Sequence, residues 1–89
     1  MAGEISMYCT AMCPYCQMAE RLLAQKGVTD LNKIRVDLEP GRRAEMMERT
    51  GRRTVPQIYI GDLHVGGCDD LYALDQAGTL ERLLRGESA

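Results

Sequence analysis

Two cysteines three residues apart, in the stretch Cys13-Pro14-Tyr15-Cys16, are the residues of this sequence best suited to chemistry. Proline is favoured at the first position of a helix, and apolar side chains at helical spacing follow it, so Cys13 is expected at a helix N-terminus. There, free backbone N–H groups and the positive end of the helix dipole favour thiolate over thiol. Because thiolate is the attacking form, the sequence predicts Cys13 as a redox nucleophile and Cys16 as its resolving partner.

Metal binding is an alternative use of these cysteines. Cys9, Cys13 and Cys16 form a C-x3-C-x2-C cluster, which has the ligand type of a zinc site. A structural zinc site takes four ligands, however, and the single histidine, His64, falls in an expected hairpin strand, where we expect a surface residue. A structural disulfide is a third use, but such bonds are rare in the cytosol. A CxxC motif near a βαβ unit favours redox chemistry over both.

The composition indicates the setting in which this chemistry would occur. The 89 residues are 45% apolar and 27% charged, with a net charge of −2, which does not favour nucleic-acid binding. The N-terminus lacks the basic segment and long apolar core of a signal peptide, and no apolar run reaches the roughly 18 residues needed to span a bilayer. We therefore expect a cytoplasmic protein with one domain, residues 1–89, and no membrane partner.

The elements that must position the cysteines follow from hydrophobic spacing and turn residues. Strands are expected at 4–8, 33–37, 57–60 and 63–65, and helices at 14–26, 42–49, 68–78 and 80–84. Gly61-Asp62 fits a two-residue hairpin turn. The first half is a βαβ crossover, which joins parallel strands, and the second half is a hairpin followed by a helix. The order β-α-β-α-β-β-α predicts an α/β fold with a four-stranded mixed sheet flanked by helices.

A cluster of five arginines departs from the mild acidity of the chain. They are Arg42, Arg43, Arg49, Arg52 and Arg53. A solvated helix face is one explanation. The other is a basic rim that attracts an anionic ligand or an acidic partner.

Three separated motifs, taken together, resemble the glutaredoxin family. They are CPYC at 13–16, Thr54-Val55-Pro56 followed by QIYI, and GGCDDL at 66–71. The similarity covers nearly the whole chain, and the run GGCDDLYALD is most similar to the bacterial glutaredoxin-3 group. The resemblance implies a thioredoxin-like fold and a glutathione-dependent thiol–disulfide oxidoreductase that reduces protein disulfides and protein–glutathione mixed disulfides. It also implies glutathione as a co-substrate, without a tightly bound cofactor.

The resemblance further implies where glutathione binds. Pro56 would be cis and would present the backbone of Val55 beside Cys13, so that the cysteinyl unit of glutathione pairs with it like an added strand. The γ-glutamyl carboxylate would lie on backbone N–H groups at the helix N-terminus that follows Gly67, where anions are favoured. Asp70 is a weaker candidate for a contact. The implied contact residues are Tyr15, Thr54, Val55, Pro56, Gly67, Cys68 and Asp69.

One position departs from the family pattern. Many members carry a lysine three residues before the first CxxC cysteine, where it supports the thiolate and the glycyl carboxylate of glutathione, and this chain has Thr10 at that position. Either Arg52 or Arg53, beside the TVP segment, supplies the charge instead, or the charge is missing. If it is missing, Cys13 has less thiolate character and glutathione binds less tightly.

The two other cysteines have different expected roles. Cys9 directly follows the first strand and is expected to be a small buried apolar residue, with a regulatory thiol as the alternative. Cys68 falls in the implied glutathione cleft, where it could be oxidised or glutathionylated. Neither role follows from spacing alone.

The expected partners, besides glutathione, are disulfide-bonded or glutathionylated proteins, with ribonucleotide reductase as one candidate, and the protein is expected to be a monomer. Besides a zinc-binding interaction module that would use the cysteine cluster described above, two alternative functions remain open. One is an iron–sulfur carrier that holds a cluster through Cys13 and glutathione; cluster-binding members usually have Gly or Ser where this chain has Pro14. The other is a redoxin reduced by thioredoxin reductase, which the absence of tryptophan disfavours.

Overall fold

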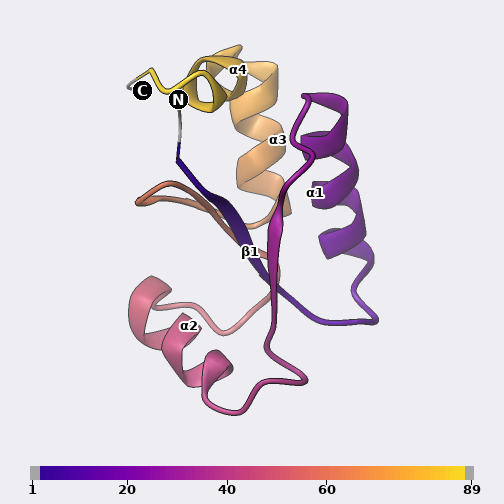
Figure 1. The fold of residues 1–89 in the computed structure, drawn as a ribbon, viewed down its shortest axis with the longest axis vertical. Coiled ribbons are helices and arrows are strands. Elements are labelled where there is room, and N and C mark those ends of the chain that lie inside the picture. Colours follow the sequence, from indigo (N-terminus) through magenta and orange to yellow (C-terminus); the bar gives the residue numbers. More distant parts are fainter. Residues whose placement is uncertain (1–2, 88–89) are drawn as a thin grey trace.

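A mixed four-stranded sheet with helices on both faces is the framework of the protein (Figure 1). The structure, a computed structural model, describes residues 3–87. Every element expected from the sequence is present, with boundaries that differ by at most two residues. The elements are β1 (Ile5–Cys9), α1 (Pro14–Gln25), β2 (Asn32–Arg35), α2 (Arg42–Thr50), β3 (Gln57–Ile60), β4 (Leu63–Gly66), α3 (Cys68–Gln76) and α4 (Thr79–Leu84).

The strand order is β2-β1-β3-β4, with β1 parallel to β2 and antiparallel to β3. The parallel pair is the one joined by the crossover through α1. Strands β3 and β4 form an antiparallel hairpin in which Ile60 pairs with Leu63, so the two-residue turn expected at Gly61-Asp62 is confirmed. All five residues of β1 are buried, Ser6 included, because the strand has neighbours on both sides and helices over both faces.

Two clusters of buried side chains hold the layers together, one on each face of the sheet. Figure 1 shows α1 and α3 on one side of the sheet and α2 on the other. Alternate residues of β1 and β3 pack against α1, α3 and α4, whereas Tyr8 and Tyr59, at the intervening positions, pack against Met46 of α2. No helix within residues 3–87 combines the length and the apolar character needed to cross a membrane.

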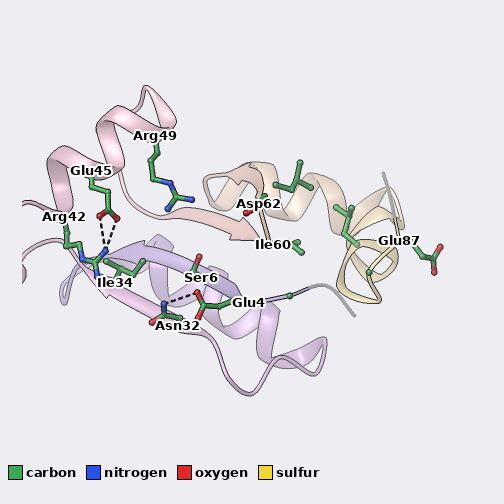
Figure 2. A pocket seen from close by; sticks show the side chains of 15 residues that line it. Glu4, Ser6, Asn32, Ile34, Arg42, Glu45, Arg49, Ile60, Asp62 and Glu87 are labelled. Carbon is green, nitrogen blue, oxygen red and sulfur yellow. Dashed lines mark hydrogen bonds and ion pairs between the residues drawn. The ribbon is translucent and has the colours of Figure 1, made fainter.

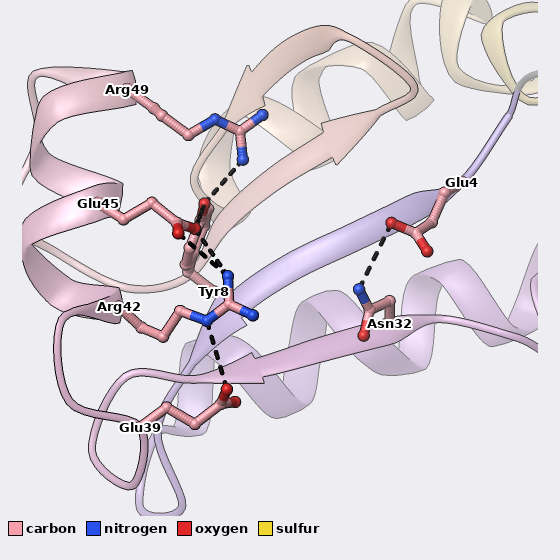
Figure 3. Close-up of polar contacts among 7 residues, drawn as sticks. All are labelled: Glu4, Tyr8, Asn32, Glu39, Arg42, Glu45 and Arg49. Carbon is pink, nitrogen blue, oxygen red and sulfur yellow. Dashed lines mark hydrogen bonds and ion pairs between the residues drawn. The ribbon is translucent and has the colours of Figure 1, made fainter.

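A polar network on the α2 face uses two of the clustered arginines (Figure 3). Tyr8 is fully buried, and its hydroxyl donates to Glu45 and accepts from Arg49 Nη1 at 2.7 Å. Arg42 Nη1 donates to both oxygens of the same carboxylate, at 3.1 and 3.0 Å. The pKa of Glu45 is lowered, first by the Tyr8 hydroxyl and then by Arg42. Arg49 and Glu45 therefore fasten α2 to β1 through Tyr8, and Arg42 holds the Glu45 carboxylate in place.

Beside this network lies a groove of about 950 Å³ over the same face of the sheet (Figure 2). Charged groups of both signs line it, and several are already paired, as Figure 2 shows for Arg42 with Glu45 and for Asn32 with Glu4. Among the residues of 3–87 that line the groove there is no cysteine. The groove is thus separate from the thiol chemistry that the sequence predicts.

Candidate functional site

Strand register brings the three sequence motifs to one end of the sheet. Tyr8, at the end of β1, pairs with Gln57, at the start of β3, and Ile58 pairs with Gly66, at the end of β4. The loop that leads from β1 to Cys13, the segment before β3 and the N-terminus of α3 therefore meet at this edge. The site is therefore formed by loops and helix N-termini at the ends of the strands, and not by residues in the middle of the strands.

Cys13 is the N-cap residue of α1 and has an extended backbone, with φ −134° and ψ 99°. Its sulfur accepts the backbone N–H of Cys16 at 3.2 Å, a contact that favours negative charge on the sulfur. The first turn of α1 contains no acidic residue that would oppose this charge. The Cys13 side chain is 8% exposed, and its Sγ lies 3.9 Å from the carbonyl oxygen of Val55. Cys13 thus borders the segment that the family resemblance places against glutathione.

Cys16 lies one helical turn further into the protein and is 3% exposed. Burial is the main cause that raises the pKa of the Cys16 thiol, and its contact with Cys13 adds to the effect. Cys16 is therefore a protonated thiol at neutral pH. This asymmetry between an N-cap sulfur and a buried thiol matches the roles predicted from the motif.

A cleft of about 370 Å³ opens beside Cys13 and brings together all seven residues predicted as glutathione contacts. The Val55–Pro56 peptide bond is cis, as the resemblance implied. Sequence reasoning missed Gln57 as a lining residue, because nothing in the type or spacing of a strand residue after a proline indicates that it borders a cleft. The lining residues are Tyr15, Arg52, Thr54, Val55, Pro56, Gln57, Gly67, Cys68 and Asp69.

Asp70 organises the rim of this cleft instead of lining it. Its Oδ2 accepts the backbone N–H of Gly67 at 2.9 Å, which caps α3, and also accepts Arg52 Nη1 at 3.0 Å. The pKa of Asp70 is lowered, first by the Gly67 N–H and then by Arg52. Asp69, the neighbouring acid, is exposed and lines the cleft.

Arg52 is placed where it could supply the positive charge that is missing because Thr10 stands in the position of the usual lysine. Of the two arginines considered from the sequence, Arg52 lines the cleft, held there by Asp70. Arg53 is not among the lining residues; its carbonyl oxygen accepts Arg43 Nη1 at 3.2 Å. A guanidinium at the rim of the cleft is thus available to an anionic group, on a different element from the usual lysine.

Cys9 and His64 are the remaining residues for which the sequence made a prediction. The prediction for Cys9 is confirmed and the one for His64 is wrong. Cys9 is 2% exposed within the apolar core, and burial raises the pKa of its thiol, so its expected burial is confirmed. His64 is not a plain surface residue: it is half-buried, its Nε2 lies 2.8 Å from Gln57 Oε1, and burial lowers its pKa. Within residues 3–87, no group of three or more potential ligands is arranged to hold a metal ion.

Gly66 provides a test of how tightly this rim is built. Its φ of +114° disfavours any side chain, and a Cβ there would overlap the Asp70 carboxylate. We expect Gly66→Ala to lower the free energy of unfolding by about 2–4 kcal/mol, combining backbone strain with loss of the α3 cap. Urea unfolding with Gly27→Ala as control measures this, because Gly27 also has positive φ, +93°, but nothing within 4 Å of its Cβ position. Equal losses in the two variants would contradict a role for the Asp70 contact.

Comparisons with known proteins agree with this arrangement. The family model described as Glutaredoxin matches residues 5–65. A glutaredoxin of Pseudomonas aeruginosa is 54% identical over 80 residues, covering 90% of this chain and 94% of that protein. Glutaredoxin 3 of Escherichia coli K12 is 48% identical over 83 residues, covering 93% and 99%.

Solved structures give the same result at the level of the fold. The buckwheat glutaredoxin–glutathione complex superimposes with a TM-score of 0.86 at 30% identity, covering 92% of this chain and 76% of that one. The solution structure of glutaredoxin from Brucella melitensis gives a TM-score of 0.81 at 49% identity, covering 97% and 94%.

Proposed function

The chain belongs to the glutaredoxin family, and from this premise we propose that it reduces protein–glutathione mixed disulfides and protein disulfides with Cys13 as nucleophile. The fold is thioredoxin-like, and the protein is a glutathione-dependent thiol–disulfide oxidoreductase. The observation that supports the assignment to Cys13 is its N-cap sulfur, which accepts a backbone N–H and borders the cleft at Val55. Cys16, buried behind it, is the resolving thiol.

Reduction of a mixed disulfide needs only Cys13 and free glutathione. The Cys13 thiolate attacks the glutathione sulfur of the substrate, and the target protein leaves as a thiolate that takes up a proton. A second glutathione thiolate then attacks the glutathione sulfur bound to Cys13. Glutathione disulfide is released and Cys13 returns as a thiolate, so each mixed disulfide reduced consumes one free glutathione, and the other half of the glutathione disulfide comes from the substrate.

Reduction of a protein disulfide adds Cys16. Cys13 attacks one sulfur of the substrate and forms a mixed disulfide with it, releasing the first substrate thiol. Cys16 loses its proton and attacks the Cys13 sulfur, which releases the second substrate thiol and leaves a Cys13–Cys16 disulfide. Two glutathione molecules then reduce this disulfide through the glutathione adduct of Cys13.

The cleft offers a distinct group for each part of glutathione. The backbone of Val55 pairs with the cysteinyl unit and sets the sulfur beside Cys13. The N-terminus of α3, at Gly67 and Cys68, takes the γ-glutamyl carboxylate, and exposed Asp69 faces the α-amine. Tyr15, Thr54 and Pro56 complete the walls. This assignment is supported by the presence of all these residues in one cleft and by the buckwheat relative, whose solved structure is a glutathione complex.

The proposed setting is cytoplasmic, with the protein acting as a monomer of one domain. Its partners are disulfide-bonded or glutathionylated proteins, and ribonucleotide reductase is a candidate among them. The experiment that tests the function follows a glutathionylated peptide by mass spectrometry in the presence of glutathione. The peptide thiol should appear at a rate proportional to the protein concentration; release no faster than with glutathione alone would overturn the proposal.

Arg52 is proposed to bind the glycyl carboxylate in place of the lysine that Thr10 replaces. Because the Arg52 side chain is half-exposed, we expect Arg52→Met to raise the KM for a glutathionylated peptide about three- to five-fold, with kcat nearly unchanged. Arg53→Met removes the same charge one residue away, outside the cleft, and should leave KM at the wild-type value. A larger KM increase in Arg53→Met than in Arg52→Met would assign the carboxylate to Arg53.

A further inference from the structure

A buried amide beside the cleft links the glutathione segment to a residue that the mechanism does not use. Gln57 is 1% exposed, and its Nε2 donates to the carbonyl oxygen of Thr54 at 3.0 Å and lies 3.5 Å from the Thr54 hydroxyl. Its Oε1 lies 2.8 Å from His64 Nε2. Every polar atom of this amide therefore has a partner, and two of the three contacts go to the residue before Val55.

The directions of these bonds fix one another. A carbonyl oxygen can only accept, so the Gln57 atom that faces the Thr54 carbonyl must be the amide nitrogen. The amide oxygen then faces His64, and His64 Nε2 must carry the hydrogen of the shared bond. This donor is present in the neutral Nε2–H imidazole and in the imidazolium alike. If His64 Nε2 carried no hydrogen, the Gln57 amide would have to turn over to donate to it. The Gln57 oxygen would then face the Thr54 carbonyl oxygen, and two acceptors would repel each other.

The sheet explains why these three residues meet. Gln57 and Tyr59 occupy alternate positions of β3 and share one face, and His64 is the cross-strand partner of Tyr59. The Tyr59 and His64 rings lie 5.1 Å apart between centroids, at 30° to each other. The guanidinium of Arg49 lies 4.1 Å from the Tyr59 centroid, and Arg49 in turn belongs to the network of Figure 3. The His64 ring is thus held in place by its contact with Tyr59, which in turn packs against Arg49 of α2.

We propose that His64 is a positioning residue that acts through Gln57 to hold the Thr54 carbonyl, and so sets the backbone of Val55 against glutathione. This inference rests on the proposed function. His64 is not among the residues that line the cleft, whereas Thr54 and Val55 are, and the Val55 carbonyl oxygen is 3.9 Å from Cys13 Sγ. A shift of Thr54 would move the one backbone edge that pairs with the cysteinyl unit.

The expected effect is on binding rather than on the chemical step. In the proposed complex the backbone of Val55 pairs with the cysteinyl unit both in the bound substrate and in the transition state, so we expect its displacement to act mainly on KM and much less on kcat. His64→Leu removes the donor and leaves Gln57 Oε1 buried without a partner. We expect about a tenfold higher KM for a glutathionylated peptide, with kcat within about two-fold of the wild-type value.

Four companion variants distinguish positioning from a general loss of structure. His64→Gln keeps an N–H donor at nearly the reach of Nε2 and should restore a KM close to that of the wild type. Leu63→Ala changes the exposed neighbour on β4 and should leave KM unchanged. Gln57→Met keeps length and burial but removes both contacts, so its KM should rise. Because His64 acts through Gln57, the double variant His64→Leu/Gln57→Met should have the KM of Gln57→Met alone.

The decisive experiment measures kcat and KM for all five variants at a temperature where circular dichroism shows each to be folded. A wild-type KM in His64→Leu, a KM in His64→Gln as high as in His64→Leu, or multiplicative effects in the double variant would each overturn the inference. Failure of the proposed function is recognised separately, because the wild-type protein itself would then not release the peptide thiol with glutathione.

Discussion

Cys13→Ser is expected to abolish reduction of both glutathione mixed disulfides and protein disulfides, lowering each rate by at least roughly 10³-fold. Every proposed route begins with attack by the Cys13 sulfur, and a serine hydroxyl at neutral pH neither ionises nor attacks a disulfide sulfur. Serine is a preferred N-cap residue, so α1 should keep its start and the protein its fold. The loss would therefore report on chemistry and not on stability.

Initial rates with a glutathionylated peptide and with a disulfide-bonded protein measure this effect. Cys9→Ala is the matched control, because it removes a different buried thiol at the end of β1 and should retain activity at a temperature where it is folded. Activity in Cys13→Ser comparable to that of the wild type would assign the nucleophile to another cysteine. Cys68, which lines the cleft, would then be the first to examine.

Cys16→Ser is expected to separate the two reactions. Reduction of glutathione mixed disulfides needs no second protein thiol, so its rate should stay within a few-fold of the wild-type rate. Reduction of a protein disulfide should fall by about 10²-fold or more, because intramolecular attack by Cys16 is replaced by attack from dilute external thiol. Rates for both substrates with one enzyme preparation provide the comparison, and parallel losses in the two would contradict the assigned role of Cys16.

The pH dependence of the dithiol reaction should differ from that of the monothiol reaction for the same reason. Burial raises the pKa of Cys16, so its thiolate fraction is small at neutral pH and grows as pH rises. Part of this shift comes from Cys13, whose free thiol is consumed when the mixed disulfide forms. In the wild type, the resolving step should therefore keep accelerating at pH values above those at which the ordinary thiol of glutathione, with a pKa of about 8.5, has ionised, whereas Cys16→Ser should show only the glutathione-dependent acceleration.

Local spacing was sufficient to predict the elements and the placement of Cys13 and Cys16 at the start of α1. Proline after Cys13, followed by apolar residues at helical intervals, identifies the N-terminus of α1 without reference to the rest of the chain. The residues of the cleft were predicted in a different way, because Val55, Pro56 and Gly67 were identified by their resemblance to a family pattern. Spacing alone does not show that residues so far apart in the chain share one cleft.

The contacts that the sequence did not predict depend on how separate elements pair and pack against one another. Tyr8 and Glu45 are 37 residues apart, and Arg52 and Asp70 are 18 apart, so no local pattern joins them. His64 was expected on the surface because a polar residue in a short hairpin strand usually faces solvent. Its contact with Gln57 depends on the cross-strand pairing of β3 and β4, which is irregular between Ile58 and Tyr59. A single sequence does not indicate such an irregularity.

The central claim, that glutathione is the electron source and that the cleft beside Cys13 receives it, is tested most directly by a coupled assay. A small glutathione mixed disulfide is reduced with NADPH supplied through glutathione and glutathione reductase, and in parallel through thioredoxin reductase. We predict turnover with the glutathione couple alone. Turnover with thioredoxin reductase alone would contradict the account, since the protein would then be a redoxin whose cleft does not serve glutathione.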